Sequence, residues 1–154
     1  DKISINSAAV INPELIASLA KRFGSQCIIV AIDTKQEQVD WFVYTHGGKI
    51  KTTLKTIDWA KQVEELGAGE ILLTSMNNDG TKDGFANHIT KTISESVNIP
   101  IIASGGAGTM EHFADVFIEG EADAALAASV FHYNEIKIPE LKKYLSTHNI
   151  PVRI

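Results

Sequence analysis

IIASGGAGTMEHF, residues 101–113, contains a short apolar strand, a glycine-rich turn and the start of a helix. The strand ends at Ser104, and Gly105, Gly106 and Gly108 follow within four residues. Glycines let the backbone approach a ligand closely, and the first turn of a helix has N–H groups without intrahelical partners. A tight turn alone would explain one such glycine, but three favour an anion site. The stretch therefore predicts a β-loop-α unit that binds phosphate.

The same order of strand, loop and helix recurs along the chain. Apolar strands are expected at residues 2–6, 27–33, 70–74, 99–104 and 122–127. Helices are expected between them, and a β-hairpin around residues 46–48 is inserted after the second strand. Alternating strands and helices favour an α/β fold with five parallel strands and right-handed crossovers.

Strand ends distinguish a barrel from an open, doubly wound sheet. Four successive strands end in small or polar residues, in the segments AID, LLTS, IASGG and LAAS. All strand ends meet at one mouth in a (β/α)₈ barrel, whereas an open sheet needs such residues only at its switch point. The sequence therefore predicts a partial (β/α)₈ TIM barrel. A whole barrel has eight strands and about 250 residues, so residues 1–154 are expected to form one domain that lacks the N-terminal βα units.

Composition excludes several classes of protein. The net charge of −5 argues against nucleic acid as a partner, because no basic face can neutralise its phosphates. Cys27 is the single cysteine, which predicts no disulfide framework and a reducing, cytoplasmic location. No apolar run approaches the roughly 20 residues of a membrane span. The five histidines are scattered without the spacing of a metal site, so no metal and no cofactor are predicted.

Two aspartates are candidate catalytic residues. Asp33 ends a buried strand, where it could act as a general acid or base or simply cap the next turn. Asp79 lies in the loop of ILLTSMNNDGTKDG, residues 71–84, and with Gly80 could turn that loop over a ligand. A carboxylate beside a phosphate is costly unless it is catalytic or binds hydroxyls, although an Asx-turn at Asp79 is the structural alternative. Thr74 is expected at the mouth, where it could contact substrate.

The stretch ALAASVFH, residues 125–132, predicts a second part of the phosphate site. Ala127, Ala128 and Ser129 are small residues at a strand end, and a short helix is expected after them. Barrels often bind phosphate with the loops after their last two strands and such a helix.

Five stretches together resemble the cyclase subunit of imidazole glycerol phosphate synthase. They are KISINSAAV (residues 2–10), GSQCIIVAID (24–33), GAGEILLTSMNNDGTKDG (67–84), IIASGGAG with MEHF (101–113) and ADAALAASVFH (122–132). The resemblance covers essentially the whole chain. It implies a barrel enzyme of histidine biosynthesis that takes ammonia from a glutaminase partner. Its substrate, phosphoribulosyl-formimino-aminoimidazole carboxamide ribonucleotide, is converted to imidazole glycerol phosphate and aminoimidazole carboxamide ribonucleotide.

The resemblance also assigns residues to roles. Asp33 matches one of two aspartates that act as acid and base, and the other belongs to a first strand that these residues do not contain. One phosphate site matches Gly80, Ser104, Gly105, Gly106, Ala128 and Ser129. Asn6 and Ser7 match one side of a second phosphate site, and Lys2 and Glu70 match charged residues that gate ammonia entry. Asn77 departs from the family pattern, in which an acidic residue is frequent.

Two alternatives remain open. The sibling phosphoribosyl isomerase shares the DGT and SGG themes, and a truncated half-barrel could bind phosphate without catalysis. The open strand edges of such a half-barrel predict self-association.

Overall fold

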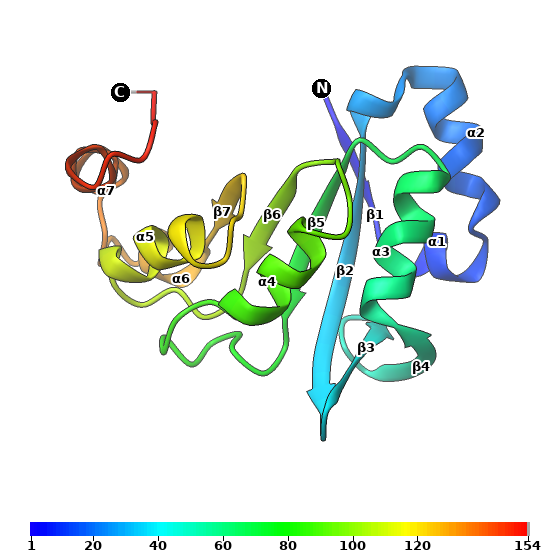
Figure 1. The fold of residues 1–154 in the computed structure, drawn as a ribbon, viewed down its shortest axis with the longest axis horizontal. Helices are drawn as coiled ribbons and strands as arrows, with labels where there is room; N and C mark the ends of the chain where they lie inside the picture. The colour runs from blue at the N-terminus through cyan, green and yellow to red at the C-terminus, as the bar shows by residue number, and fades with distance from the viewer. Residues whose placement is uncertain (154) are drawn as a thin grey trace.

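The protein forms one seven-stranded sheet in a computed structural model that describes residues 1–153. The strands are β1 (Ile3–Ile5), β2 (Ile28–Glu37), β3 (Asp40–Thr45), β4 (Ile50–Lys55), β5 (Glu70–Ser75), β6 (Ile101–Ser104) and β7 (Ala124–Leu126). β1, β2, β5, β6 and β7 pair in parallel, each with the next in the chain. The order of the parallel strands has no reversal of the kind that defines a doubly wound sheet. The predicted partial barrel, which is not closed, is therefore confirmed (Figure 1).

Helices connect the parallel strands, and two more follow the last strand. They are α1 (Ser7–Ile11), α2 (Glu14–Phe23), α3 (Thr56–Glu65), α4 (Asn87–Ser94), α5 (Met110–Ile118), α6 (Ser129–His132) and α7 (Ile138–Thr147), with the 3-10 helix η1 at Ser25–Cys27. The short helix α6 was predicted, whereas α1 was not. None of the helices within residues 1–153 has the length and apolar character needed to cross a membrane.

The inserted hairpin is present and extends the second parallel strand. β3 and β4 pair antiparallel around the predicted turn. The expectation that the second strand ends at Asp33 was wrong, because β2 continues to Glu37 and residues 33–37 pair with β3. Asp33 therefore lies within β2, at the point where its neighbour on one edge changes from β1 to β3.

The main core lies between one face of the sheet and the helices. Ile28, Val30 and Ile32 alternate along β2 and are fully buried. They pack in one cluster with Trp59 of α3 and Ile93 of α4. Each such aliphatic side chain contributes about 1.5–3 kcal/mol by leaving water. This face fixes the positions of the strands, so their carboxyl ends are held rigidly.

Asp115 on α5 is an electrostatic weak point of the fold. Its carboxyl group is partly buried, and Glu119 and Glu111 lie near it. Burial first, and then the two glutamates, raise the pKa of Asp115 above its ordinary value. The ionised carboxylate is therefore less favourable in the folded state than in the unfolded state.

Replacing Asp115 with asparagine should raise the free energy of unfolding at neutral pH by a few tenths to about 1 kcal/mol. The pKa of Asp115 is raised in the folded state, so the destabilisation caused by its charge is absent below the unfolded-state pKa. This destabilisation grows as pH rises through the folded-state pKa. Urea unfolding at acidic and neutral pH measures the difference.

Asp58→Asn is the matched control, because Asp58 is an exposed carboxylate in the first turn of α3. Negative charge is favourable there, so this variant should gain no stability. An equal gain in both variants would contradict the prediction for Asp115.

Candidate active site

A row of polar side chains crosses the carboxyl ends of three parallel strands. Asp33 of β2 pairs in register with Thr74 of β5, which pairs with Ser104 of β6. Partners in register lie side by side on the same face of a sheet. All three are half-buried on the face opposite the helix-covered core. The register alone therefore brings together three residues that the sequence predicted at a common mouth.

Asp33 is held by a neighbour from the first loop. Asn6 Nδ2 donates a hydrogen bond to Asp33 Oδ2 at 3.0 Å. Asn6 Oδ1 is buried and has no hydrogen-bond partner within the described part of the chain. The contact fixes the carboxylate in orientation. Asn6 thus lies next to the candidate acid–base group, although it was predicted at a phosphate site.

The Asp33 carboxylate faces a cavity of about 330 Å³. The other lining residues are Gly47, Gly48, Thr74, Met76 and Asp79. Gly47 and Gly48 belong to the turn between β3 and β4, so the tip of the inserted hairpin forms one wall. The sequence predicted the hairpin but not this placement, because antiparallel pairing of β3 with the end of β2 cannot be read from local periodicity.

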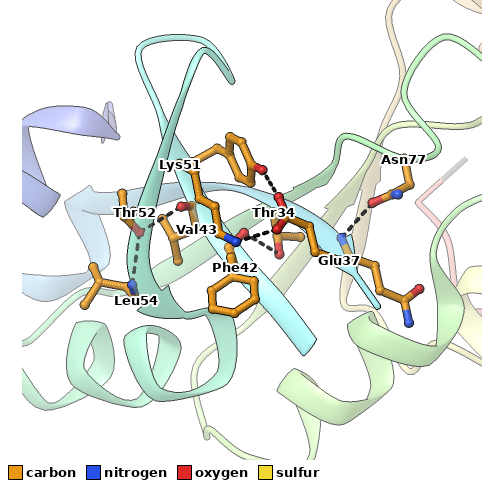
Figure 2. A network of polar contacts seen from close by, with 10 residues as sticks. Thr34, Glu37, Phe42, Val43, Lys51, Thr52, Leu54 and Asn77 are labelled. Atoms are coloured by element: carbon orange, nitrogen blue, oxygen red, sulfur yellow. Dashed lines mark hydrogen bonds and ion pairs between the residues drawn. The ribbon is translucent and has the colours of Figure 1, made fainter. Parts of the chain in front are cut away.

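A polar network holds the hairpin in place (Figure 2). Glu37 accepts hydrogen bonds from Lys51 and Tyr44, and these bonds hold its pKa below the ordinary value. Asn77 Oδ1 accepts the N–H of Gln36 at 2.8 Å, which ties the loop after β5 to the end of β2. The amide of Asn77 performs this structural role without a charge.

The predicted phosphate-binding residues line a second cavity, of about 200 Å³. This cavity, called the cradle below, is lined by Asp79, Gly80, Lys82, Ser104, Gly105, Gly106, Ala107, Leu126, Ala127, Ala128 and Ser129. Six of these residues match the phosphate site implied by the resemblance. They come from three separate segments, which are the loop after β5, the end of β6 with its turn, and the junction of β7 with α6, so the cradle exists only in the folded chain.

Asp79 lines both cavities and therefore joins the cradle to Asp33. Its N–H donates to the carbonyl of Ser75 at 2.9 Å, which fixes the backbone. Its carboxylate makes no hydrogen bond to any of residues 1–153, so the Asx-turn alternative does not describe it. The neighbouring Asn78 instead organises the loop, by donating to the carbonyl of Gly84 at 2.9 Å.

The glycines after β6 are required by a close approach of two loops. The N–H of Gly84 donates to the carbonyl of Gly106 at 2.8 Å. A Cβ at Gly106, whose φ is +105°, would lie 2.0 Å from the Gly84 carbonyl oxygen, and one at Gly105 would lie 2.8 Å from that of Ser75. Packing of the loop after β5 thus accounts for these glycines, in addition to any ligand.

The start of α5 differs from the prediction of free N–H groups. Nδ1 of His112 accepts the N–H of Gly108 at 3.1 Å and that of Thr109 at 3.3 Å. These donors are used within the protein, and Gly108 does not line the cradle. His112 thus occupies two of the N–H groups that precede α5, and anion binding by the start of this helix stays a prediction.

The remaining predicted residues lie outside both cavities. Ser7 Oγ accepts the N–H of His46 at 2.8 Å, so it contacts the hairpin. Lys2 and Glu70 form an ion pair at the amino ends of β1 and β5. This end of the sheet is opposite to Asp33, so the pair occupies the face that the resemblance assigns to ammonia entry.

A third cavity, of about 730 Å³, lies away from these residues. It is mainly apolar and lies between α5, β7 and α7, with Phe113, Phe131 and Leu141 among its lining. It contains none of the predicted site residues, so we do not assign the chemistry to it. Within residues 1–153, no three His, Cys, Asp or Glu side chains are grouped closely enough to hold a metal ion.

The chain is similar to known proteins over its full length. It is 62% identical over 154 residues to the imidazole glycerol phosphate synthase subunit HisF of Flavobacterium psychrophilum, covering 100% of this chain and 61% of that protein. The proteins of the same name from Cytophaga hutchinsonii and Hydrogenobaculum sp. are 63% and 59% identical, over 99% and 100% of this chain and 61% and 62% of their own lengths. The chain thus spans about three fifths of the length of the curated relatives it matches.

A family model described as Histidine biosynthesis protein matches residues 1–137. The match includes all seven strands, Asp33, Asp79 and the cradle. The chain therefore belongs to the histidine biosynthesis protein family.

Proposed function

We propose that this chain carries the phosphate-binding part and one acid–base group of the cyclase of imidazole glycerol phosphate synthase. The observation that carries the proposal is the position of Asp79, which lines both the cavity of Asp33 and the glycine-rich cradle. A substrate bound by a phosphate in the cradle would extend past Asp79 toward Asp33. The names of the relatives support the same activity, and none of those above is named as the sibling isomerase.

The proposed reaction needs a group that moves protons. Ammonia and the phosphoribulosyl-formimino-aminoimidazole carboxamide ribonucleotide give imidazole glycerol phosphate, aminoimidazole carboxamide ribonucleotide and water. Closing the imidazole ring joins the ammonia nitrogen to the carbonyl carbon, whose oxygen leaves as water, and to the formimino carbon, whose C–N bond to the released ribonucleotide breaks. Each step transfers protons. Asp33, oriented by Asn6 at 3.0 Å, is the proposed acid or base. Asp79 is proposed to bind hydroxyl groups or to assist proton transfer.

The cradle is proposed to bind the phosphate mainly through backbone groups. Ser104, Gly105 and Gly106 would contact it from one side, and Ala128 and Ser129 from the other. Backbone N–H groups bind anions without requiring a basic protein, which suits a net charge of −5. Asn6 and Ser7 are proposed to contribute to a second phosphate site, near the hairpin.

The chain is proposed to correspond to the C-terminal portion of a longer barrel. Its five parallel strands are fewer than the eight that close such a barrel, and its relatives are longer. By resemblance, the second catalytic aspartate lies on a strand that these 154 residues do not contain. Residues 1–154 alone are therefore proposed to bind phosphate without turnover.

A glutaminase is the proposed protein partner. The relatives are named as subunits of a synthase, which implies assembly with another subunit. The Lys2–Glu70 pair lies at the end of the sheet opposite to Asp33. Its proposed role is to control the entry of ammonia from the partner.

Open strand edges are the proposed basis of self-association when residues 1–154 are expressed alone. The edge strand β4 includes Lys51 and Lys55, and edge lysines discourage pairing. β1 and β7 have no charged residue within their bounds. Pairing is therefore proposed at β1 and β7 rather than at β4.

The catalytic role of Asp33 is testable in a chimera that joins residues 1–154 to the part of the F. psychrophilum protein that this chain does not match. Asp33→Asn should lower ammonia-dependent turnover by about 10²–10⁴-fold, the usual contribution of a general acid or base. Asp58→Asn makes the same chemical change outside the site and should leave turnover unchanged. Turnover of the Asp33 variant within a few-fold of the parent would remove Asp33 from the mechanism.

The role of Glu70 is testable by comparing two nitrogen sources. In the same chimera with a glutaminase subunit, Glu70→Gln should lower glutamine-dependent turnover several-fold and leave turnover with added ammonium salt unchanged. The reason is that the pair would affect only ammonia delivered by the partner. Lys55→Gln removes another surface ion pair, with Asp40 at 3.1 Å, and serves as the control. A parallel fall with both nitrogen sources would contradict a gating role.

Self-association is testable by light scattering of residues 1–154 over a range of concentrations. A dimer or larger oligomer is expected, and Ile3→Lys should weaken it, because Ile3 lies exposed on β1. Val39→Lys adds the same charge in the turn between β2 and β3, at a residue that is 87% exposed, and should have no effect. A monodisperse monomer of the parent chain would rule out pairing through these edges.

A further inference from the structure

The cradle contains one cationic side chain, that of Lys82. No other lysine or arginine among the described residues lines either the cradle or the cavity of Asp33. Asp79 lines the cradle as well, so its carboxylate would repel a bound phosphate. Backbone N–H groups carry only partial charges. A full positive charge beside Asp79 would therefore make the site far more favourable for a dianion.

The backbone of Lys82 is fixed so that its side chain starts at the edge of the cradle. Its φ is +63°, in the left-handed region that few non-glycine residues of the described chain adopt. A Cβ at Gly108 would lie 2.3 Å from the Lys82 carbonyl oxygen and 2.8 Å from its Cβ. The absence of a side chain at Gly108 thus allows Lys82 to pack closely against the loop after β6, which leaves only the flexible end of the lysine free to move.

That flexible end is paired with a carboxylate that does not line the cradle. Lys82 Nζ lies 2.7 Å from both carboxylate oxygens of Glu135, which follows α6. The two side chains are 44% and 39% exposed. Ion pairs exposed to this extent contribute little to stability, because water screens them. Exchanging the carboxylate for a phosphate dianion would cost little and would give stronger charge-assisted hydrogen bonds.

We propose that Lys82 is a phosphate-binding residue of the cradle and that Glu135 competes with phosphate for it. In the free protein Glu135 holds the ammonium group, and the bound phosphate displaces Glu135. This inference rests on the proposed phosphate site and adds to it a cation that neither the motif nor the resemblance assigns. Removing one partner of an ion pair is usually expected to be unfavourable. Here the loss of the Glu135 carboxylate should instead improve phosphate binding.

The test is a titration of the protein with inorganic phosphate, in which binding is measured by the NMR chemical shifts of the Gly105 and Ser129 amides. Lys82→Gln should weaken phosphate binding about 3–10-fold, since one partly exposed charge-assisted contact is lost. Glu135→Gln should tighten binding about 2–3-fold, because the competing carboxylate is neutralised. In the double variant, the gain from Glu135→Gln should disappear.

Lys91→Gln is the matched control. Lys91 pairs with Glu121 at 2.7 Å, is equally exposed at 44%, and lines neither cavity. The same change of net charge there should leave the phosphate dissociation constant unchanged. Circular dichroism of each variant should match that of the parent, because all these side chains are on the surface.

The outcomes separate the two levels of the proposal. If phosphate does not change the amide chemical shifts of Gly105 or Ser129 in the parent protein, the proposed phosphate site is wrong. The proposed role of Lys82 is then wrong as well. If the parent binds phosphate and Lys82→Gln behaves like Lys91→Gln, only the role of Lys82 is overturned. If Glu135→Gln weakens binding, the competition is overturned, because Glu135 would then position Lys82 for the ligand.

Discussion

The parallel register of β2, β5 and β6 is the constraint on which the candidate site depends. Each side chain in a parallel sheet has a partner at the same level on the next strand. Asp33, Thr74 and Ser104 occupy one such level, although they are far apart in sequence. A shift of one residue in any pairing would turn these side chains toward the helix-covered core, where a carboxylate is costly. The burial of alternate apolar residues therefore maintains the geometry of the polar ones.

The loops beyond this level form the site by packing on one another. The loop after β5 contacts the loop after β6 so closely that glycine is required at Gly105 and Gly106. The same contact presents Asp79 to two cavities. A glycine-rich turn thus has two physical causes, approach to a ligand and approach to another loop, and both can operate at one residue. Only the structure distinguishes these two causes, as Gly108 illustrates. Its N–H donates to Nδ1 of His112, and Lys82 packs where a side chain at Gly108 would lie.

The sequence predicts local features of this protein better than contacts between distant segments. The five parallel strands, the hairpin and α6 follow from apolar runs, turn residues and small residues, which are local signals. The continuation of β2 past Asp33 depends on pairing with β3, and the wall formed by Gly47 and Gly48 depends on where the hairpin folds back. Such contacts join residues whose local patterns are unrelated. The pairing of Lys82 with Glu135 lies across 53 residues and has no local signal at all.

The burial pattern of the parallel strands gives a further reason to regard the open sheet as part of a closed barrel. Ile29, Leu72 and Ile102 alternate with the fully buried residues and face away from the helices, yet they are apolar and only half-buried. A sheet with one face in water normally has polar residues there, whereas parallel strands covered on both faces are apolar throughout. The helices of this chain cover one face. In a closed barrel the second face needs no further layer, because the strands on the far side of the ring fill the interior with their own side chains. In the proposed barrel, the strands contributed by the additional length of the relatives would cover these half-buried apolar residues. Asp33 would then lie at the rim of the barrel interior instead of on an exposed sheet.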